Sequence, residues 1–135
     1  MGCGERLARI VYDTSVLLLA YEGVDVFEEA AQLLGSKPEC IVPEPVVAEL
    51  ERLRRSSSFH KRRAASLALE LMKRRGCRVI RTAATNADDA VIELVTSDCT
   101  AIAATADNEL RRRLRELGLP NIYYRRSRHG LMLEG

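Results

Sequence analysis

Long apolar runs, closely spaced cysteines and a strong net charge are all missing from this sequence of 135 residues. No apolar segment approaches the roughly 20 residues that a membrane-spanning helix needs. Glu5, Arg6 and Arg9 interrupt the region where a signal peptide would be apolar. The four cysteines form no C-x-x-C pair, which argues against a zinc site or a redox motif and favours free cysteines in apolar surroundings. We therefore expect no membrane segment and a cytoplasmic location.

The sequence contains enough apolar material for one packed domain, with 47% hydrophobic and 30% charged residues. Apolar, β-prone segments predict strands at 8–12, 40–42, 77–80, 100–104 and 122–124. Between them, helical patterns lie at 15–21, 26–34, 46–53, 60–75, 87–97 and 109–117. This alternation predicts an α/β fold of three layers, with helices on both faces of a central parallel sheet of four to five strands. A basic tail is expected from about 125 to 135.

Two aspartates stand where a predicted strand ends. An apolar run ends abruptly in Asp13, and Asp107 follows a second apolar strand in the same way. Ligands of open α/β sheets bind outside the carboxyl ends of the strands, so both carboxylates are candidates for one site. The alternative is that these aspartates, or the hydroxyls of Thr14 and Ser15, only cap the helices that follow.

Three further acids lie on predicted helices. Glu49 is one turn from both Val46 and Leu53, at the edge of an apolar stripe, although it can also extend to solvent. Asp88 and Asp89 begin another helix, where acids gain from the helix dipole whatever their function. Asp88 shares the apolar face of that helix, whereas Asp89 is rotated outward by about one residue.

These acids together predict a pocket of four carboxylates. Such a cluster repels itself unless it is protonated or holds cations. Oxygen ligands without cysteine or histidine select hard ions, here Mg²⁺ or Mn²⁺. The chemistry that suits such ions is activation of water and neutralisation of charge at a phosphodiester.

Basic residues are concentrated locally although the net charge is only +2. Three clusters contain them: Arg52, Arg54, Arg55, Lys61, Arg62 and Arg63; Arg111, Arg112, Arg113 and Arg115; Arg125, Arg126, Arg128 and His129. Each alone is explained by a solvated helix face, but beside an acidic centre they suggest phosphate binding. The predicted RNA contacts are Arg54, Arg55, Arg62, Arg63, Arg111 and Arg115. The segment 52–63, which contains a break at 56–58, suggests a mobile flap over the site. Tyr123 or Tyr124 is either a base-stacking residue or part of the core.

The order of these motifs resembles the PIN-domain ribonucleases over nearly the whole chain. The motifs are Asp13-Thr14-Ser15, Pro45-Val46-Val47-Ala48-Glu49-Leu50, Ala87-Asp88-Asp89-Ala90 and Ala104-Thr105-Ala106-Asp107. The arginine-rich stretch 104–115 and the ending Ile122-Tyr123-Tyr124 are most similar to the ribosome-processing branch of the family. Toxins of the VapC type share the acids but usually lack that helix.

The resemblance implies one PIN-like domain over 1–135 that acts as a metal-dependent endoribonuclease. Catalytic and metal-binding roles are carried over to Asp13, Glu49 and Asp107. The third acid stays open, since the toxin-type spacing of 18 residues before Asp107 selects Asp89 while the helical face selects Asp88, which we prefer. Residues expected to orient bound water or these carboxylates are Thr14, Ser15, Thr105 and Glu109.

The expected partner is single-stranded or exposed RNA, with precursor ribosomal RNA as one candidate. Two alternatives remain. One is a VapC-type toxin, which would also bind an antitoxin, and the other is a non-catalytic PIN domain that binds RNA as a scaffold. Homodimers are common in the family, so a homodimer is expected.

Overall fold

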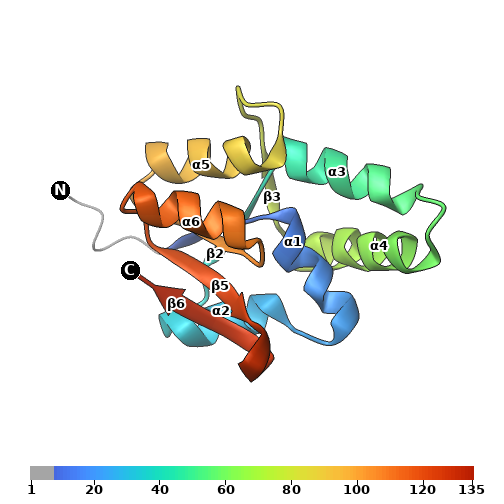
Figure 1. Cartoon of the computed structure of the whole chain (residues 1–135), viewed down its shortest axis with the longest axis horizontal. Helices are drawn as coiled ribbons and strands as arrows, with labels where there is room; N and C mark the ends of the chain where they lie inside the picture. The colour runs from blue at the N-terminus through green and yellow to red at the C-terminus, as the bar shows by residue number, and fades with distance from the viewer. Residues whose placement is uncertain (1–7) are drawn as a thin grey trace.

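The computed structural model describes residues 8–135 of the chain, which form a mixed α/β structure (Figure 1). In chain order its helices and strands are β1 (Arg9–Tyr12), α1 (Thr14–Leu17), the 3₁₀ helix η1 (Leu18–Glu22), α2 (Val26–Leu34), β2 (Glu39–Pro43), α3 (Glu44–Arg54), α4 (Phe59–Arg74), β3 (Arg78–Ile80), α5 (Ala87–Ser97), β4 (Ala101–Thr105), α6 (Asn108–Glu116), β5 (Asn121–Arg125), the 3₁₀ helix η2 (Arg126–Arg128) and β6 (Gly130–Glu134). The alternation of strands and helices predicted from the sequence is confirmed.

A single six-stranded sheet has the strand order β3-β2-β1-β4-β5-β6. The first five of these strands run parallel to their neighbours, and β6 pairs with β5 in the antiparallel direction. Strand β1 lies inside the sheet, and its residues Ile10, Val11 and Tyr12 are at most 2% exposed. Burial on both faces explains why this strand is an unbroken apolar run rather than an alternating one.

Residues 125–135 are not a tail, in contrast to the prediction. They complete a hairpin in which η2 forms the turn and β6 returns along β5. Leu131 is only 5% exposed, and its backbone N–H donates to Glu29 Oε1 on α2 at 2.7 Å. The arginines of the turn suggest a solvated tail, but the apolar residues that follow them allow this segment to pack on the sheet and on α2.

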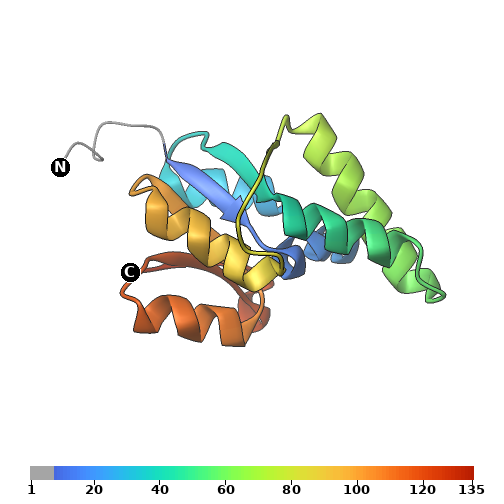
Figure 2. The same ribbon diagram turned by 90° about the horizontal axis from the view of Figure 1, so that it is seen from above.

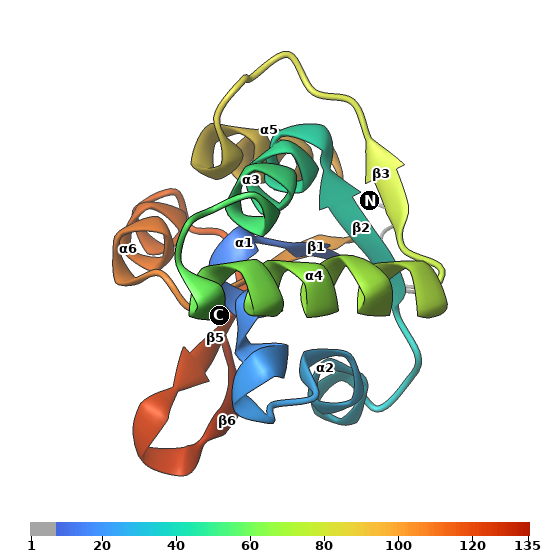
Figure 3. The same ribbon diagram turned by 90° about the vertical axis from the view of Figure 1, so that its right-hand side faces the viewer.

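Helices cover both faces of the sheet. Helices α5 and α6 lie on one side and α2 on the other (Figure 3). Helices α3 and α4 pack side by side as a pair that extends beyond the carboxyl end of the central strands (Figures 1 and 2). This extension places α3 at the strand ends where ligands of parallel sheets bind. No helix within residues 8–135 combines the length and the apolar character needed to cross a membrane.

The prediction of free cysteines is wrong for this structure. Cys40 and Cys77 form a disulfide with their Cα atoms 4.6 Å apart, and Cys99 is disulfide-bonded as well. Parallel pairing of β2 with β3 sets Ile41 opposite Arg78, which brings the two preceding residues, Cys40 and Cys77, side by side. The two cysteines are 37 residues apart, so only the pairing of the strands reveals them as partners.

Candidate functional site

Asp13 lies at the carboxyl end of β1 and is the most buried acid of the predicted set, with 3% exposure. Its backbone N–H donates to the Ala104 carbonyl of β4 at 2.9 Å, which places it next to the end of that strand. The carboxylate oxygen Oδ2 accepts hydrogen bonds from Ser15 Oγ at 2.7 Å and from Thr105 Oγ1 at 3.0 Å. Although Asp13 precedes helix α1, its side chain makes no capping hydrogen bond to that helix.

Burial raises the pKa of Asp13, because a carboxylate loses hydration energy when it leaves water. The hydroxyl groups of Ser15 and Thr105 oppose this rise in the pKa by donating to the charged form, and the negative charge of Asp107 adds to it. Within residues 8–135 Asp13 forms no ion pair, and a buried carboxylate of this kind favours the binding of a positive ligand.

Two hydroxyls connect Asp13 to the segment that carries Asp107. Ser15 Oγ and Thr105 Oγ1 are 3.2 Å apart. The backbone N–H of Ala106 donates to Ser15 at 2.9 Å, and that of Asp107 donates to Thr105 at 2.9 Å. The side chains predicted to orient the site therefore also fix the backbone between β4 and α6.

Asp107 caps helix α6, as the alternative interpretation of the sequence allowed. Its Oδ1 accepts from the backbone N–H groups of Glu109 at 2.8 Å and Leu110 at 3.3 Å. This leaves Oδ2 as the oxygen of Asp107 available to a ligand. Capping and ligand binding are therefore compatible at this residue.

Glu49 reaches the same end of the sheet from helix α3. Thr14 Oγ1 donates to Glu49 Oε1 at 2.6 Å, which ties this carboxylate to the residue next to Asp13. The bond turns Glu49 toward the strand ends. Thr14 is thus the third predicted hydroxyl that orients an acid of the site.

Asp88 and Asp89 have different surroundings in the structure. Asp89 accepts from Asn86 Nδ2 at 2.8 Å and from Arg113 Nη2 at 2.9 Å, and these bonds lower its pKa. In contrast, the pKa of Asp88 is raised to about 6, first by burial and then by the negative charges of Asp13 and Asp107, with a smaller contribution from Glu49. Asp88 therefore lies in the field of the other acids, whereas Asp89 is engaged by cationic and amide donors.

A cleft of about 460 Å³ lies between α3 and the beginning of α5, and both Glu49 and Asp88 line it. Arg52 on α3 lines the cleft as well, although it is outside the set of predicted RNA contacts. Arg113 was also missed, yet it binds Asp89 and lowers the pKa of Asp88. Arg113 lies three residues after the buried Leu110, and residues at this spacing are neighbours on a helix surface, so its closeness to the buried face of α6 was the available signal.

The acids match a hard divalent cation by type and charge but do not form a preformed cage. Among residues 8–135, no group of three or more His, Cys, Asp or Glu side chains is arranged to hold a metal ion. Mg²⁺ usually keeps several waters and is held by one or two carboxylates together with substrate phosphates, so a preformed cage is not required. The burial of Asp13 and the negative charges around Asp88 both favour a cation at this end of the sheet.

Other predicted residues lie away from this centre. Glu109 forms a surface ion pair with Arg112, so its role in the site stays a prediction. Arg111 binds Glu134 of β6 at 2.9 Å, and Arg115 lies 3.7 Å from the same carboxylate. Both arginines therefore face the β5–β6 hairpin.

The remaining predicted RNA contacts are grouped at the far end of the α3–α4 pair. Arg54 pairs with Glu51 on the surface of α3, and Arg55 is exposed. The guanidinium groups of Arg62 and Arg63 lie 5.6 and 5.5 Å from the ring centroid of Phe59, which is 61% exposed. This end presents positive charge and an exposed aromatic ring.

The turn at 56–58, in the middle of the predicted flap 52–63, is held by several hydrogen bonds. Ser58 caps α4, and Arg62 Nη1 donates to the carbonyl oxygens of Ser56 at 3.2 Å and Ser57 at 3.3 Å. A hydrogen-bonded turn between two packed helices is a short connection rather than a long loop.

Replacing Asp88 with Asn is expected to stabilise the metal-free protein above pH 6. The pKa of Asp88 rises from 3.8 to about 6 on folding, so ionised Asp88 destabilises the fold at neutral pH. After allowance for solvent screening at this half-exposed group, we expect a gain of about 1–2 kcal/mol in the free energy of unfolding at pH 7. The gain should shrink as the pH falls from 6 to 4, because the native aspartate is then protonated.

Urea unfolding of the metal-free Asp88→Asn variant and wild type across pH 4–8 measures this difference. Asp89→Asn is the matched control and should show the opposite sign, because the pKa of Asp89 is lowered by Asn86 and Arg113. A pH-independent difference for Asp88→Asn would show that Asp88 does not lie in the field of the other acids.

Comparison with known proteins gives the same result as the resemblance of the motifs. The protein Ribonuclease VapC4 of Methanocaldococcus jannaschii is 28% identical over 122 residues, which cover 90% of this chain and 93% of that protein. The structure of the PIN domain endonuclease Utp24 superimposes with a TM-score of 0.74 at 25% sequence identity, covering 93% of this chain and 90% of that one. A family model described as PIN like domain matches residues 10–127. Because that match spans most of the chain and its four acidic motifs, this protein belongs to the PIN like domain family.

Proposed function

We propose that this protein is a metal-dependent endoribonuclease that hydrolyses RNA phosphodiester bonds. The observation that carries the proposal is the buried Asp13 at the end of β1. In addition to burial, the charge of Asp107 raises the pKa of Asp13, and the charges of Asp13 and Asp107 raise the pKa of Asp88, so the three carboxylates lie close together. Relatives named as a ribonuclease and as a PIN domain endonuclease support the same chemistry.

Asp13, Glu49, Asp88 and Asp107 would hold Mg²⁺ or Mn²⁺ together with water and the phosphate of the substrate. When bound, such an ion supplies an activated water and neutralises the charge that develops on the phosphodiester. The chain itself fixes the carboxylates. Ser15 and Thr105 hold Asp13, and Thr14 holds Glu49.

A positively charged surface is also needed to bring the RNA to the site, because four carboxylates by themselves repel a phosphodiester. Arg52 stands in the cleft with Glu49 and Asp88 and is placed to contact a phosphate there. Farther out, the arginines of the α3–α4 end (Arg54, Arg55, Arg62 and Arg63) would extend the contact to neighbouring phosphates.

Two biological roles use the same chemistry. The arginine-rich helix α6 and the tyrosines of β5 support processing of precursor ribosomal RNA, the branch that these motifs resemble. The sequence identity with Ribonuclease VapC4 favours the second role, a VapC-type toxin whose partner is an antitoxin.

Cleavage of single-stranded RNA should stop in excess chelator and return when Mn²⁺ or Mg²⁺ is added. The reason is that the site offers oxygen donors of net negative charge, which cannot bind a phosphodiester without a cation. A gel assay with a labelled RNA, chelator and stepwise metal addition measures this. Full activity in excess chelator would contradict the metal mechanism, and absence of cleavage with every metal would favour the RNA-binding scaffold.

A further inference from the structure

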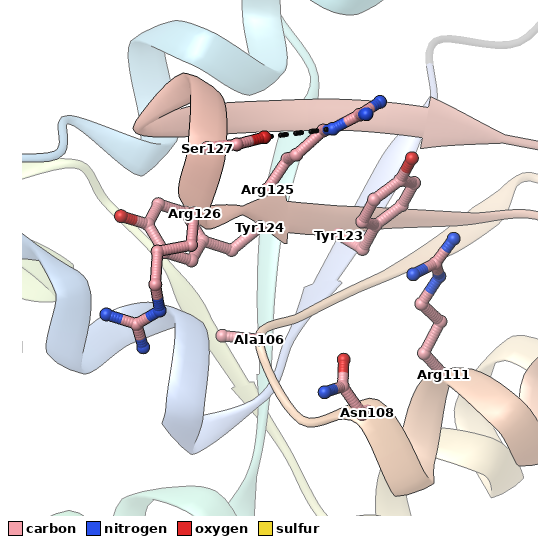
Figure 4. A pocket seen from close by; sticks show the side chains of 8 residues that line it. All are labelled: Ala106, Asn108, Arg111, Tyr123, Tyr124, Arg125, Arg126 and Ser127. Atoms are coloured by element: carbon pink, nitrogen blue, oxygen red, sulfur yellow. Dashed lines mark hydrogen bonds between the residues drawn. The ribbon is translucent and has the colours of Figure 1, made fainter.

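A second cavity of about 480 Å³ lies next to the acidic site, between α6 and the β5–β6 hairpin (Figure 4). Ala106 and Asn108, which precede and follow Asp107 in the chain, form one wall. Tyr123 and Tyr124 of β5 and the first residues of the hairpin turn form the other. The cavity and the acids therefore meet at Asp107.

The side chains of this cavity differ in charge from those of the acidic site. Arg111, Arg125 and Arg126 line it, and none of the lining residues is acidic. Positive charge combined with aromatic rings is the combination that binds single-stranded nucleic acid, because arginine attracts phosphate and rings stack on bases.

The guanidinium of Arg111 lies over the ring of Tyr123 as a preassembled stack. The guanidinium carbon of Arg111 lies 3.6 Å from the ring centroid of Tyr123. Glu134 holds the guanidinium by accepting from Nε at 2.9 Å and from Nη2 at 3.3 Å. Since the two groups are already fixed, the protein loses little conformational entropy when a base stacks on them.

Arg126 lies across the cavity from this stack (Figure 4). Its side chain is exposed and forms no hydrogen bond or ion pair with any residue of the described part of the chain, while its backbone carbonyl accepts from the His129 N–H at 3.1 Å. Its neighbour Arg125, in contrast, donates to Ser127 Oγ at 3.3 Å. Arg126 is therefore the arginine of this wall that is free to take a phosphate.

We propose that this cavity binds one nucleotide of the RNA strand beside the phosphodiester that is cut, with the base on the Arg111–Tyr123 stack and the phosphate at Arg126. The inference rests on the proposed function and adds to it a defined nucleotide subsite. An acidic protein segment would use the arginines alone, whereas a nucleotide uses both the arginines and the aromatic ring of the stack. The structure thus assigns to the hairpin the part of substrate binding that the acids cannot provide.

The test measures binding of a labelled single-stranded RNA to full-length protein carrying Asp13→Asn, which prevents cleavage. Tyr123→Leu and Arg126→Ala are added separately, and thermal melting verifies that each variant is folded. We expect either change to weaken RNA binding by roughly tenfold. Arg126→Ala should also reduce the slope of the RNA affinity against salt concentration by about one phosphate contact. Tyr123→Leu should leave this slope unchanged.

Arg128→Ala is the matched control, since Arg128 is an exposed arginine of the same turn that does not line the cavity. It should change the affinity by less than about twofold, as expected for a surface substitution. Equal effects of Arg126→Ala and Arg128→Ala, with no effect of Tyr123→Leu, would overturn the subsite in favour of a diffuse basic surface. If Arg126→Ala weakens RNA binding in a salt-dependent way while Tyr123→Leu has no effect, base stacking is likewise overturned.

Cleavage by the same variants without Asp13→Asn distinguishes this inference from the proposed function. If Asp13→Asn abolishes cleavage while Tyr123→Leu and Arg126→Ala bind and cleave RNA like wild type, only the subsite is wrong. If the protein with native Asp13 neither binds nor cleaves RNA under any metal condition, both the proposed function and the subsite are wrong.

Discussion

Asp13→Asn is expected to reduce RNA cleavage by at least about 100-fold, the loss typical when one group that stabilises transition-state charge is removed. Asp13 is the most buried acid of the site, and two hydroxyls hold its carboxylate in place. Asparagine retains an oxygen that accepts from Ser15 and Thr105 but removes the negative charge. The rate of cleavage of a labelled RNA, measured with saturating Mn²⁺, tests this expectation.

The fold should survive this substitution. Burial raises the pKa of Asp13, which means that the folded state disfavours its charge, so a neutral side chain should raise the melting temperature of the metal-free protein. A strong loss of stability would instead identify Asp13 as a structural residue. Asp89→Asn is the control for activity and should cleave within a few-fold of wild type, because Asp89 is bound to Arg113 and Asn86.

Replacing both Cys40 and Cys77 with Ala is expected to lower the free energy of unfolding by about 4 kcal/mol. The disulfide joins residues 37 positions apart, and closing a loop of that length removes about this much conformational entropy from the unfolded chain. For a domain of this size the melting temperature should fall by about 10–15 °C. The bond connects β2 to the start of β3, a three-residue strand at the edge of the sheet.

Thermal unfolding by circular dichroism under oxidising conditions measures the loss. Single variants Cys40→Ala and Cys77→Ala should each show nearly the full effect, since either one removes the bond. Retention of the wild-type melting temperature by the double variant would mean that strand pairing alone holds this edge of the sheet.

Local patterns in the sequence were sufficient for the order and type of most elements. The predicted helices at 26–34 and 87–97 agree with α2 and α5 at both ends. Each begins after a side chain that accepts a backbone N–H, Asp25 for α2 and Asn86 for α5, so its start depends on neighbouring residues. The meeting of Asp13 with Asp107 also followed from the sequence, because carboxyl ends of parallel strands share one edge.

Other features depend on residues far apart in the chain. The periodicity of α5 favoured Asp88 over Asp89, but the different surroundings of the two acids depend on Arg113, which lies 24 positions after Asp89. Similarly, the sequence predicts Arg111 as an RNA contact, while its orientation depends on Glu134 of β6, where the sequence predicts a basic tail.

The sequence by itself therefore determined the layered α/β order and the acids at the strand ends, since hydrophobic periodicity and capping are local. Only the tertiary structure decided the disulfide between Cys40 and Cys77, the antiparallel strand β6 and the cavity beside Asp107. These require strands distant in sequence to lie side by side, and the energy of such contacts is gained only when the whole sheet is assembled.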